Sequence, residues 1–256
     1  MVVSIDHRGR IPSLPRARFS QSLPLGTASE KAQVHPEPHT LPSFRVHLLV
    51  ALMTLFSFFS TARLGGIKLR LKKGICNPGP LPGLSLLPLY MAGIRDLAKG
   101  ASVLDIGTGS GVWALLATRT RAAVTATDLP GVSLDQVKVN AEINGLATPE
   151  LLNGDLFEAI GDRRFKRILF NPPFHVGTPT TAAERAYLGG SNGNVLHRFF
   201  EMLPNHLEAD GSACIILPEI EHRYYAPALE GLNVVERASK WVPILGRVKC
   251  LELTRK

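Results

Sequence analysis

A tetrapeptide with unusual hydrogen-bonding capacity, Asn171-Pro172-Pro173-Phe174, follows a short apolar run that ends at Phe170. The Asn171 side chain offers a carbonyl oxygen, and Pro172, which has no N–H, constrains a backbone whose carbonyl can accept a second hydrogen bond. Two acceptors that face a planar NH₂ group draw its hydrogens aside and leave the nitrogen lone pair available. Phe174 adds a flat face on which an amide or a base can stack. The tetrapeptide predicts chemistry at a planar amino nitrogen; the simpler alternative is a proline-rich turn after a strand.

A second cluster of chemical interest is the glycine-rich turn at Gly107, Gly109 and Gly111. This turn joins an apolar strand predicted over residues 101–106 to a helix predicted from Val112. A parallel strand, a tight glycine turn and a helix N-terminus together present bare backbone N–H groups to a ligand. Glycines alone would also suit an ordinary turn between a strand and a helix.

Two carboxylates beside this turn narrow the choice of ligand. Asp128 ends the next predicted strand, over residues 123–127, and an acid at this place holds ribose hydroxyls in doubly wound folds. Asp105 precedes the turn, where it would repel a pyrophosphate but can pair with an ammonium group. The glycine spacing also breaks the dinucleotide fingerprint G-x-G-x-x-G. The pattern therefore predicts a nucleoside-type ligand that is not a dinucleotide.

The D-x-G-x-G-x-G arrangement resembles the first motif of class I S-adenosylmethionine methyltransferases. The resemblance implies S-adenosyl-L-methionine as the cofactor. By the same resemblance Gly107, Gly109 and Gly111 line the cofactor turn, Asp105 serves the amino-acid end of the cofactor, and Asp128 holds its ribose.

The Asn-Pro-Pro-Phe tetrapeptide resembles the [N/D]-P-P-[F/Y/W] motif of methyltransferases that modify planar exocyclic nitrogens. That group includes release-factor glutamine methyltransferases and the guanine- and adenine-N methyltransferases of the small methyltransferase domain. The resemblance implies Asn171, Pro172 and Phe174 as catalytic residues, with Asn171 also at the cofactor. Asp155 and Leu156, after a third predicted strand, match the adenine-contacting position.

The resemblance covers about residues 65–256 and implies a Rossmann-like, doubly wound α/β fold. Its sheet would have seven mostly parallel strands with an antiparallel last strand. Two βα units of roughly 30 residues each separate Gly109 from Asn171, so both motifs should lie at the carboxyl ends of strands, where ligands bind. The other predicted elements are helices over 86–97 and 195–207, a loop over the site at 176–193, and strands over 67–71, 167–170, 212–218, 232–237 and 248–253.

The formal net charge of +8 is concentrated at one end of the chain. Residues 1–75 hold 11 Lys or Arg and 3 Asp or Glu, whereas residues 76–256 hold 18 of each kind. Residues 1–45, proline-rich and without apolar periodicity, predict a disordered basic arm. A transit peptide or an over-extended start are the alternatives. We expect an N-terminal helix and strand extension over 46–83 and the methyltransferase domain over 84–256.

Residues 46–59 are strongly apolar but too few to span a bilayer, which needs roughly 20 residues. Their polar positions share one side of a helix, which predicts a helix docked on the main domain. Peripheral attachment to a membrane surface is the alternative.

The cysteine and histidine patterns exclude two classes of site. Cys76, Cys214 and Cys250 form no CxxC pair, which excludes a disulfide framework and a thiolate zinc site and favours a reducing compartment, here the cytoplasm. The histidines outside the motifs show no metal-ligand spacing, so no metal is expected. His175, directly after the tetrapeptide, could either line the substrate mouth or have no chemical duty.

These observations predict an enzyme that transfers a methyl group from S-adenosyl-L-methionine to a planar amino nitrogen, with a nucleobase in RNA favoured. Protein glutamine N5-methylation is the first alternative, although residues 77–83 lack the P-R-P-E-T-E-like run typical of release-factor enzymes. A NAD-type Rossmann oxidoreductase, a small-molecule methyltransferase and a module without catalysis are the others. The expected partner is RNA or protein. No RNA-binding signature occurs, so RNA contact is expected from the basic arm and from the strand over 67–71. Lys68, Arg70, Lys72 and Lys73 should lie beside the lip of the active site.

Overall fold

The computed structural model describes residues 60–72, 84–131, 133–181 and 184–256, together with residues 48, 51, 75 and 78. All of these residues fall in one compact unit, Pro36–Lys256. The predictions for residues 1–45, for the apolar helix over 46–59 and for most of the loop over 77–83 lie outside the described residues.

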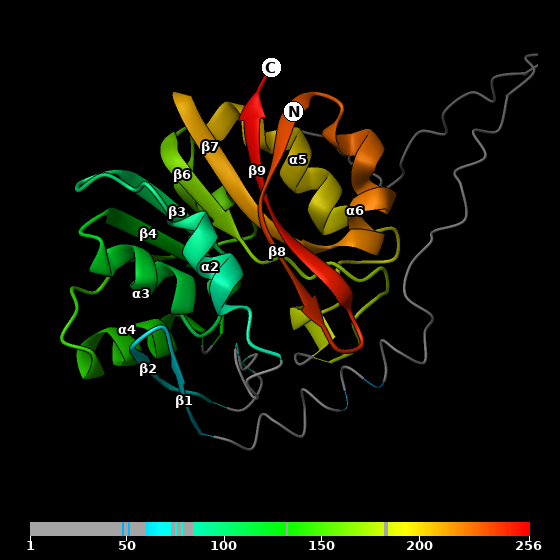
Figure 1. Ribbon diagram of the computed structural model, residues 1–256. Coiled ribbons are helices and arrows are strands. Elements are labelled where there is room, and N and C mark those ends of the chain that lie inside the picture. The colour runs from blue at the N-terminus through cyan, green and yellow to red at the C-terminus, as the bar shows by residue number, and fades with distance from the viewer. Residues whose placement is uncertain are drawn as a thin grey trace, which may run out of the picture. The chain divides into compact units, whose positions relative to one another are not determined.

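A seven-stranded sheet forms the centre of the described fold (Figure 1). Its strand order is β5-β4-β3-β6-β7-β9-β8. The first five strands in this order are parallel, and β9 runs antiparallel to both β7 and β8. This confirms the predicted Rossmann-like sheet with an antiparallel last strand. The strands are β3 Ser102–Ile106, β4 Ala123–Asp128, β5 Glu150–Asn153, β6 Phe165–Phe170, β7 Leu207–Pro218, β8 Leu232–Val242 and β9 Gly246–Arg255.

Alternating side chains along the central strands bury both faces of the sheet. In β3, Val103 belongs to one hydrophobic core and Leu104 to the other, and both are fully buried. Strands covered on both faces read as continuous apolar runs, which is the pattern the sequence shows here. The first core is built with α2 Leu87–Gly93, α3 Val112–Arg119 and α4 Ser133–Ile143, and the second with α5 Asn194–His206 and α6 Glu219–Tyr225. Three 3₁₀ turns accompany these described helices and strands: η1 Glu158–Ile160, η2 Glu184–Ala186 and η3 Ala226–Leu229.

A small antiparallel hairpin, β1 Thr61–Leu64 and β2 Ile67–Arg70, precedes the sheet. Its alternate residues Leu64, Ile67 and Leu69 are buried in the first core. The backbone N–H of Arg70 donates to Asn140 Oδ1 (2.7 Å), and that of Lys68 donates to Asn144 Oδ1 (2.8 Å). The hairpin therefore shares the hydrophobic core of the sheet domain through α3 and α4.

Element ends differ from the predictions where the apolar pattern is weak. The predicted helix over 86–97 ends at Gly93, and Asp96 beyond it has a left-handed backbone. β8 continues past the predicted end at Arg237 to Val242. This strand lies at the sheet edge, and most of its residues are not buried. An edge strand with so few buried positions shows no apolar alternation to predict its length.

Candidate active site

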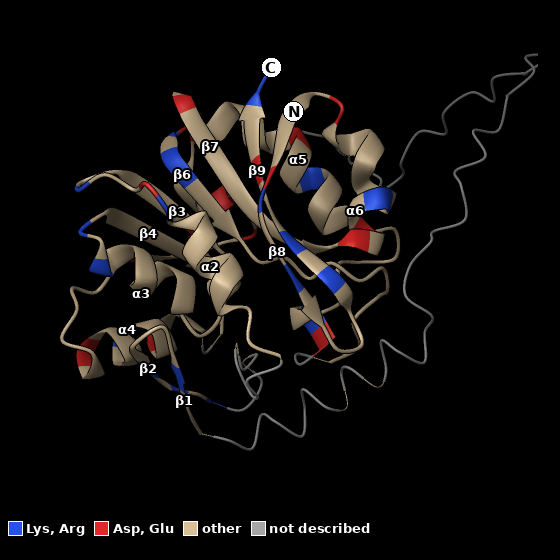
Figure 2. Cartoon of the chain, viewed as in Figure 1, with Lys and Arg blue, Asp and Glu red and all other residues tan. Residues whose placement is uncertain are grey.

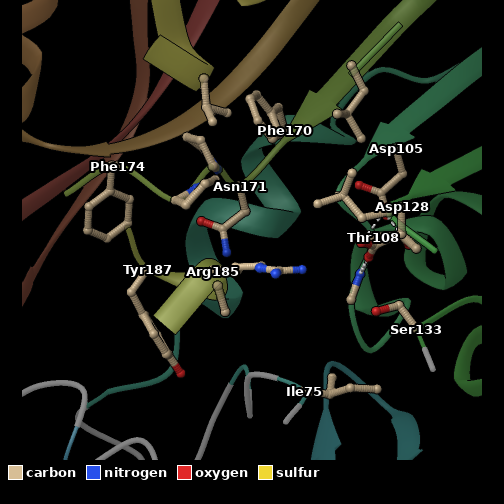
Figure 3. A pocket seen from close by; sticks show the side chains of 18 of the residues that line it. Ile75, Asp105, Thr108, Asp128, Ser133, Phe170, Asn171, Phe174, Arg185 and Tyr187 are labelled. Carbon is tan, nitrogen blue, oxygen red and sulfur yellow. Dashed lines mark hydrogen bonds between the residues drawn. The ribbon is translucent and has the colours of Figure 1, made fainter. Parts of the chain in front are cut away.

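A pocket of about 610 Å³ lies at the carboxyl ends of β3, β4 and β6. The glycine turn, Asp128 and the Asn-Pro-Pro-Phe tetrapeptide line it, which is the arrangement that the doubly wound topology predicts. Every residue predicted for the site lies in its wall except Gly111: the wall holds Asp105, Gly107, Gly109, Asp128, Asp155, Leu156, Asn171, Pro172 and Phe174. Figure 3 shows two groups of side chains facing each other across it.

Gly111 supports the site from behind the pocket wall. It is the N-cap of α3 with a left-handed backbone (φ 80°), a conformation that costs other residues free energy. A Cβ atom at this position would lie 2.9 Å from Val137 Cγ2 of α4. Gly111 therefore allows α3 and α4 to pack closely and does not itself border the pocket.

The Asp105 carboxylate is buried (2% exposed) at the end of β3. Its Oδ2 accepts hydrogen bonds from Thr108 Oγ1 (2.7 Å) and from the Ala114 N–H of α3 (3.0 Å). Burial raises the pKa of Asp105 to about 7, which the two hydrogen bonds oppose and the neighbouring charge of Asp128 adds to. Asp105 thus ties the turn to the helix while also bordering the pocket.

The Asp128 carboxylate, at the end of β4, is held by backbone donors on both oxygens. Gly109 N–H donates to Oδ2 and Leu129 N–H donates to Oδ1, both at 2.8 Å. Burial raises the pKa of Asp128, and hydrogen bonds from Gly109, Ser133 and Leu129 limit that rise. The carboxylate and the glycine turn are therefore fixed relative to each other before any ligand binds.

Asp155 and Leu156 follow β5 on the same side of the pocket. Gly154 N–H donates to the Asp128 backbone carbonyl (3.0 Å), which joins this segment to β4. Asp155 forms an ion pair with Arg198 of α5 (2.7 Å), a pocket-lining partner that the sequence did not suggest. Leu156 is buried with a positive φ of 50°, which is uncommon for a residue with a side chain.

Asn171, directly after β6, has a free acceptor inside the protein. Its Nδ2 donates to the Tyr90 hydroxyl (3.2 Å), whereas Oδ1 is buried and has no hydrogen-bond partner among the described residues. Tyr90 is itself held on α2, where its backbone carbonyl accepts from Trp113 Nε1 (2.9 Å) and its ring meets that indole edge-on. A buried acceptor without a donor is costly, so the site favours a ligand that supplies one.

Pro172 and Phe174 complete the tetrapeptide wall. Pro172 is buried, and Phe174 is 8% exposed with its ring edge-on to that of His175, 4.6 Å between centroids. Figure 3 shows Phe174, Asn171 and Tyr187 on one side of the pocket and Asp105, Thr108 and Asp128 on the other.

The chain beyond the tetrapeptide pairs with the segment around Tyr187. His175 N–H donates to the Tyr187 carbonyl (3.1 Å), and Gly189 N–H donates to the His175 carbonyl (2.8 Å). Gly177 and Gly190 exchange two further backbone hydrogen bonds. These bonds place Arg185 and Tyr187 in the pocket wall, at positions where the sequence predicted only a loop over the site.

The His175 side chain points into the protein core, so the prediction that it could line the substrate mouth is wrong. Its Nδ1 lies 2.8 Å from Glu221 Oε1 of α6, and both side chains are almost fully buried. His175 is absent from the pocket wall. Its partner is 46 residues away in sequence and carries no motif, which is why the sequence did not reveal the pair.

Of the four basic residues expected to contact RNA, the three that the structure describes do not line the pocket. Lys68, Arg70 and Lys72 are exposed, but none of them lines the pocket, and Lys73 lies outside the described residues. Figure 2 shows acidic and basic segments dispersed over the described helices and strands. Within that part of the chain there is no group of three His, Cys, Asp or Glu that could hold a metal ion, and no helix long and apolar enough to cross a membrane.

The sequence of the chain matches a known protein family. The family model of the methyltransferase small domain matches residues 89–240, more than half of the chain. The chain belongs to the methyltransferase small domain family. Membership supports an S-adenosylmethionine-dependent enzyme and favours this cofactor over the nicotinamide alternative.

Curated relatives of this methyltransferase domain modify RNA or protein. A ribosomal protein uL3 glutamine methyltransferase of Bradyrhizobium diazoefficiens is 36% identical over 121 residues, 43% of this chain and 38% of the relative. A ribosomal RNA small subunit methyltransferase C of Aeromonas hydrophila is 33% identical over 135 residues, 52% and 35% of the two chains. A tRNA1(Val) (adenine(37)-N6)-methyltransferase of Shewanella amazonensis is 29% identical over 153 residues, 56% and 64%. The chain spans less than two thirds of the length of each of these relatives.

Solved structures agree with the fold of this methyltransferase domain. The 16S rRNA N2 methyltransferase of T. thermophilus, solved in complex with AdoMet and guanosine, superposes with a TM-score of 0.59. It is 25% identical, and the match covers 77% of this chain and 50% of that one. A methyltransferase from Pyrococcus furiosus has a TM-score of 0.54 at 19% identity, over 84% and 98% of the two chains, and supports the fold alone.

Proposed function

We propose that this protein transfers a methyl group from S-adenosyl-L-methionine to a planar amino nitrogen, and that the acceptor is a nucleobase in RNA. The observation behind the proposal is the buried Asn171 Oδ1, an acceptor for which the described residues supply no donor. It lies beside a pocket whose opposite wall is the glycine turn. Relatives that methylate guanine, adenine or glutamine share one chemical feature in their acceptors, a planar NH₂ group.

The cofactor side of the pocket suits S-adenosyl-L-methionine. The Gly107–Gly109 turn has no side chains at its glycines, so the cofactor can approach the backbone closely. Asp128 is positioned for the ribose hydroxyls, and Asp105 can pair with the ammonium group. Asp155 and Leu156 border the space proposed for the adenine. When bound, this cofactor supplies a methyl group on a sulfonium, which is electrophilic enough that the acceptor needs no prior deprotonation.

The acceptor side positions the nitrogen. Asn171 Oδ1 and the Pro172 carbonyl accept the two amino hydrogens, which directs the nitrogen lone pair toward the opposite wall. Phe174 supports the plane of the base or amide. Tyr90 holds the Asn171 amide by accepting a hydrogen bond from Nδ2, so that Oδ1 remains for the acceptor. Catalysis is then chiefly orientation at short range.

Protein glutamine is the alternative acceptor, because its side-chain amide presents the same NH₂ group. The absence of the P-R-P-E-T-E-like run from residues 77–83, ahead of β3, weakens the case for release-factor glutamine. We also propose the cytoplasm as the compartment, since Cys214 and Cys250 are free, buried thiols. The boundaries 1–45, 46–83 and 84–256 remain our proposed domain organisation.

The proposal is tested by transfer of tritiated methyl groups into fractionated RNA, protein and small-molecule pools. We expect label in the RNA pool, and label in protein alone would support the glutamine alternative. A thermal-shift comparison of S-adenosylhomocysteine with NADH comes first. Stabilisation by NADH and not by S-adenosylhomocysteine would overturn the methyltransferase assignment.

A further inference from the structure

Arg185 lies on a segment that is attached to the acceptor side of the pocket. Backbone hydrogen bonds join residues 187–190 to His175 and Gly177, directly beyond the tetrapeptide. Glu184 steadies the same segment, because its carboxylate accepts from the Thr180 N–H and hydroxyl and from the Thr181 N–H. The position of Arg185 therefore follows that of the tetrapeptide and not that of the glycine turn.

The Arg185 guanidinium has no anionic partner within the described part of the chain. It is exposed, it lines the pocket, and no acidic side chain forms an ion pair with it there. The other arginine of the pocket wall, Arg198, is paired with Asp155 at 2.7 Å. Figure 3 shows the Arg185 guanidinium projecting between Asn171 and the side of the pocket that holds Asp128.

Arg185 is opposite in charge to Asp105 and Asp128, which line the same pocket. Asp105 and Asp128 lie on the cofactor side, where they suit an ammonium group and ribose hydroxyls. A guanidinium opposite them suits an anion, which it can bind through a planar fork of N–H donors. Tyr187 and Phe174, on the acceptor side, offer aromatic faces for a base.

We infer that Arg185 binds a phosphate of the acceptor, so that the substrate class is a nucleotide within RNA and not a glutamine side chain. This inference rests on the proposed function. Arg185 is then a specificity-determining residue. It binds the phosphate backbone of the RNA next to the target base, while Asn171 and Pro172 hold the amino group of that base.

The test measures binding of adenosine and guanosine, and of their monophosphates, to the protein saturated with S-adenosylhomocysteine. Wild-type protein should bind a monophosphate about tenfold more tightly than the matching nucleoside, the size expected for a charge-assisted hydrogen bond. Arg185→Gln should remove this difference, and Arg185→Lys should keep part of it. Arg95→Gln is the matched control, because Arg95 is exposed and lies outside the pocket.

S-adenosylhomocysteine affinity separates the outcomes. It should be the same in wild type, Arg185→Gln and Arg95→Gln. A loss confined to Arg185→Gln would mean that Arg185 holds the cofactor's carboxylate, which overturns the inference. Equal affinity for nucleosides and monophosphates, no binding of either, or tighter binding of a glutamine peptide would overturn it as well. Failure of wild type to bind S-adenosylhomocysteine would instead contradict the proposed function itself.

Discussion

The two sides of the pocket differ in how far the folded chain satisfies its own polar groups. On the cofactor side, both oxygens of Asp128 and one oxygen of Asp105 accept hydrogen bonds from the chain. On the acceptor side, Asn171 Oδ1 is buried without a partner and the Arg185 guanidinium has no ion-pair partner among the described residues. The first wall is hydrogen-bonded within the chain, whereas the second holds an acceptor and a cation that our proposal assigns to the methyl acceptor.

This difference implies that substitutions on the two sides should affect different steps. Changes on the cofactor side should alter the affinity for S-adenosylhomocysteine, and changes on the acceptor side should alter methyl transfer. Of the four predictions below, three test that division, from the largest expected effect to the smallest, and one concerns the stability of the ligand-free protein.

Asn171→Ala should reduce methyl transfer about 100- to 1000-fold, the loss typical of removing a hydrogen-bond acceptor or donor that positions the reacting group. The affinity for S-adenosylhomocysteine should change little. Asn171→Asp keeps an acceptor oxygen and should retain part of the activity. Asn233→Ala, in the exposed edge strand β8, is the control. Undiminished turnover in Asn171→Ala would contradict the role of this side chain.

The affinity for S-adenosylhomocysteine should rise with pH because burial raises the pKa of Asp105 to about 7. Pairing with the ligand's ammonium group requires the ionised carboxylate, so binding at pH 6 should be about tenfold weaker than its high-pH limit. Asp105→Asn should weaken binding and flatten this dependence, leaving only the smaller contribution of Asp128. Asp162→Asn, at an exposed position, should keep the wild-type profile. A profile in Asp105→Asn identical to wild type would show that another group titrates.

The same pKa shift has an opposite consequence for the stability of the ligand-free protein. The folded state retains a proton on Asp105 that the unfolded chain releases above its ordinary pKa of 3.8. This group therefore lowers stability as pH rises from about 4 to about 7, and Asp105→Asn should remove that part of the slope. Thermal unfolding across this range measures it.

Tyr90→Phe should lower kcat by about fivefold, since it removes one hydrogen bond that orients the Asn171 amide. The KM for the cofactor should remain unchanged. A general loss of packing around the pocket would change this KM as well. Tyr224→Phe also removes one hydroxyl hydrogen bond, to the Asn192 carbonyl outside the pocket wall, and is the control. Equal kcat in the two variants would show that Tyr90 does not position Asn171.

Most of the fold and the outline of the site could be predicted from the sequence because their signals are local. The strand–glycine–helix unit, the acid that ends β4 and the tetrapeptide after β6 each occupy a few consecutive residues. Parallel topology then brings their carboxyl ends to one edge of the sheet. Edge strand β8 and the end of α2 were predicted less well, since neither has a strong apolar period.

The partners of the site residues could not be predicted, because they depend on long-range packing. Tyr90 lies 81 residues from Asn171, and Arg198 lies 43 residues from Asp155. The motif residues themselves do not indicate which hydroxyl or guanidinium will reach them. Arg185 was missed for the same reason, as its place depends on backbone pairing with the chain beyond Phe174.

The sequence by itself determined the order of the βα units, the glycine turn and the residue types of the tetrapeptide, because backbone conformation and short motifs depend on neighbouring residues. Only the tertiary structure decided that Gly111 packs against α4 instead of lining the pocket and that His175 turns into the core toward Glu221. It also decided that Asn171 Oδ1 receives no hydrogen bond from the residues that the structure describes. Those outcomes depend on which side chains, distant in the sequence, occupy the same space and form the same hydrogen bonds, and only the packing of the folded chain determines that.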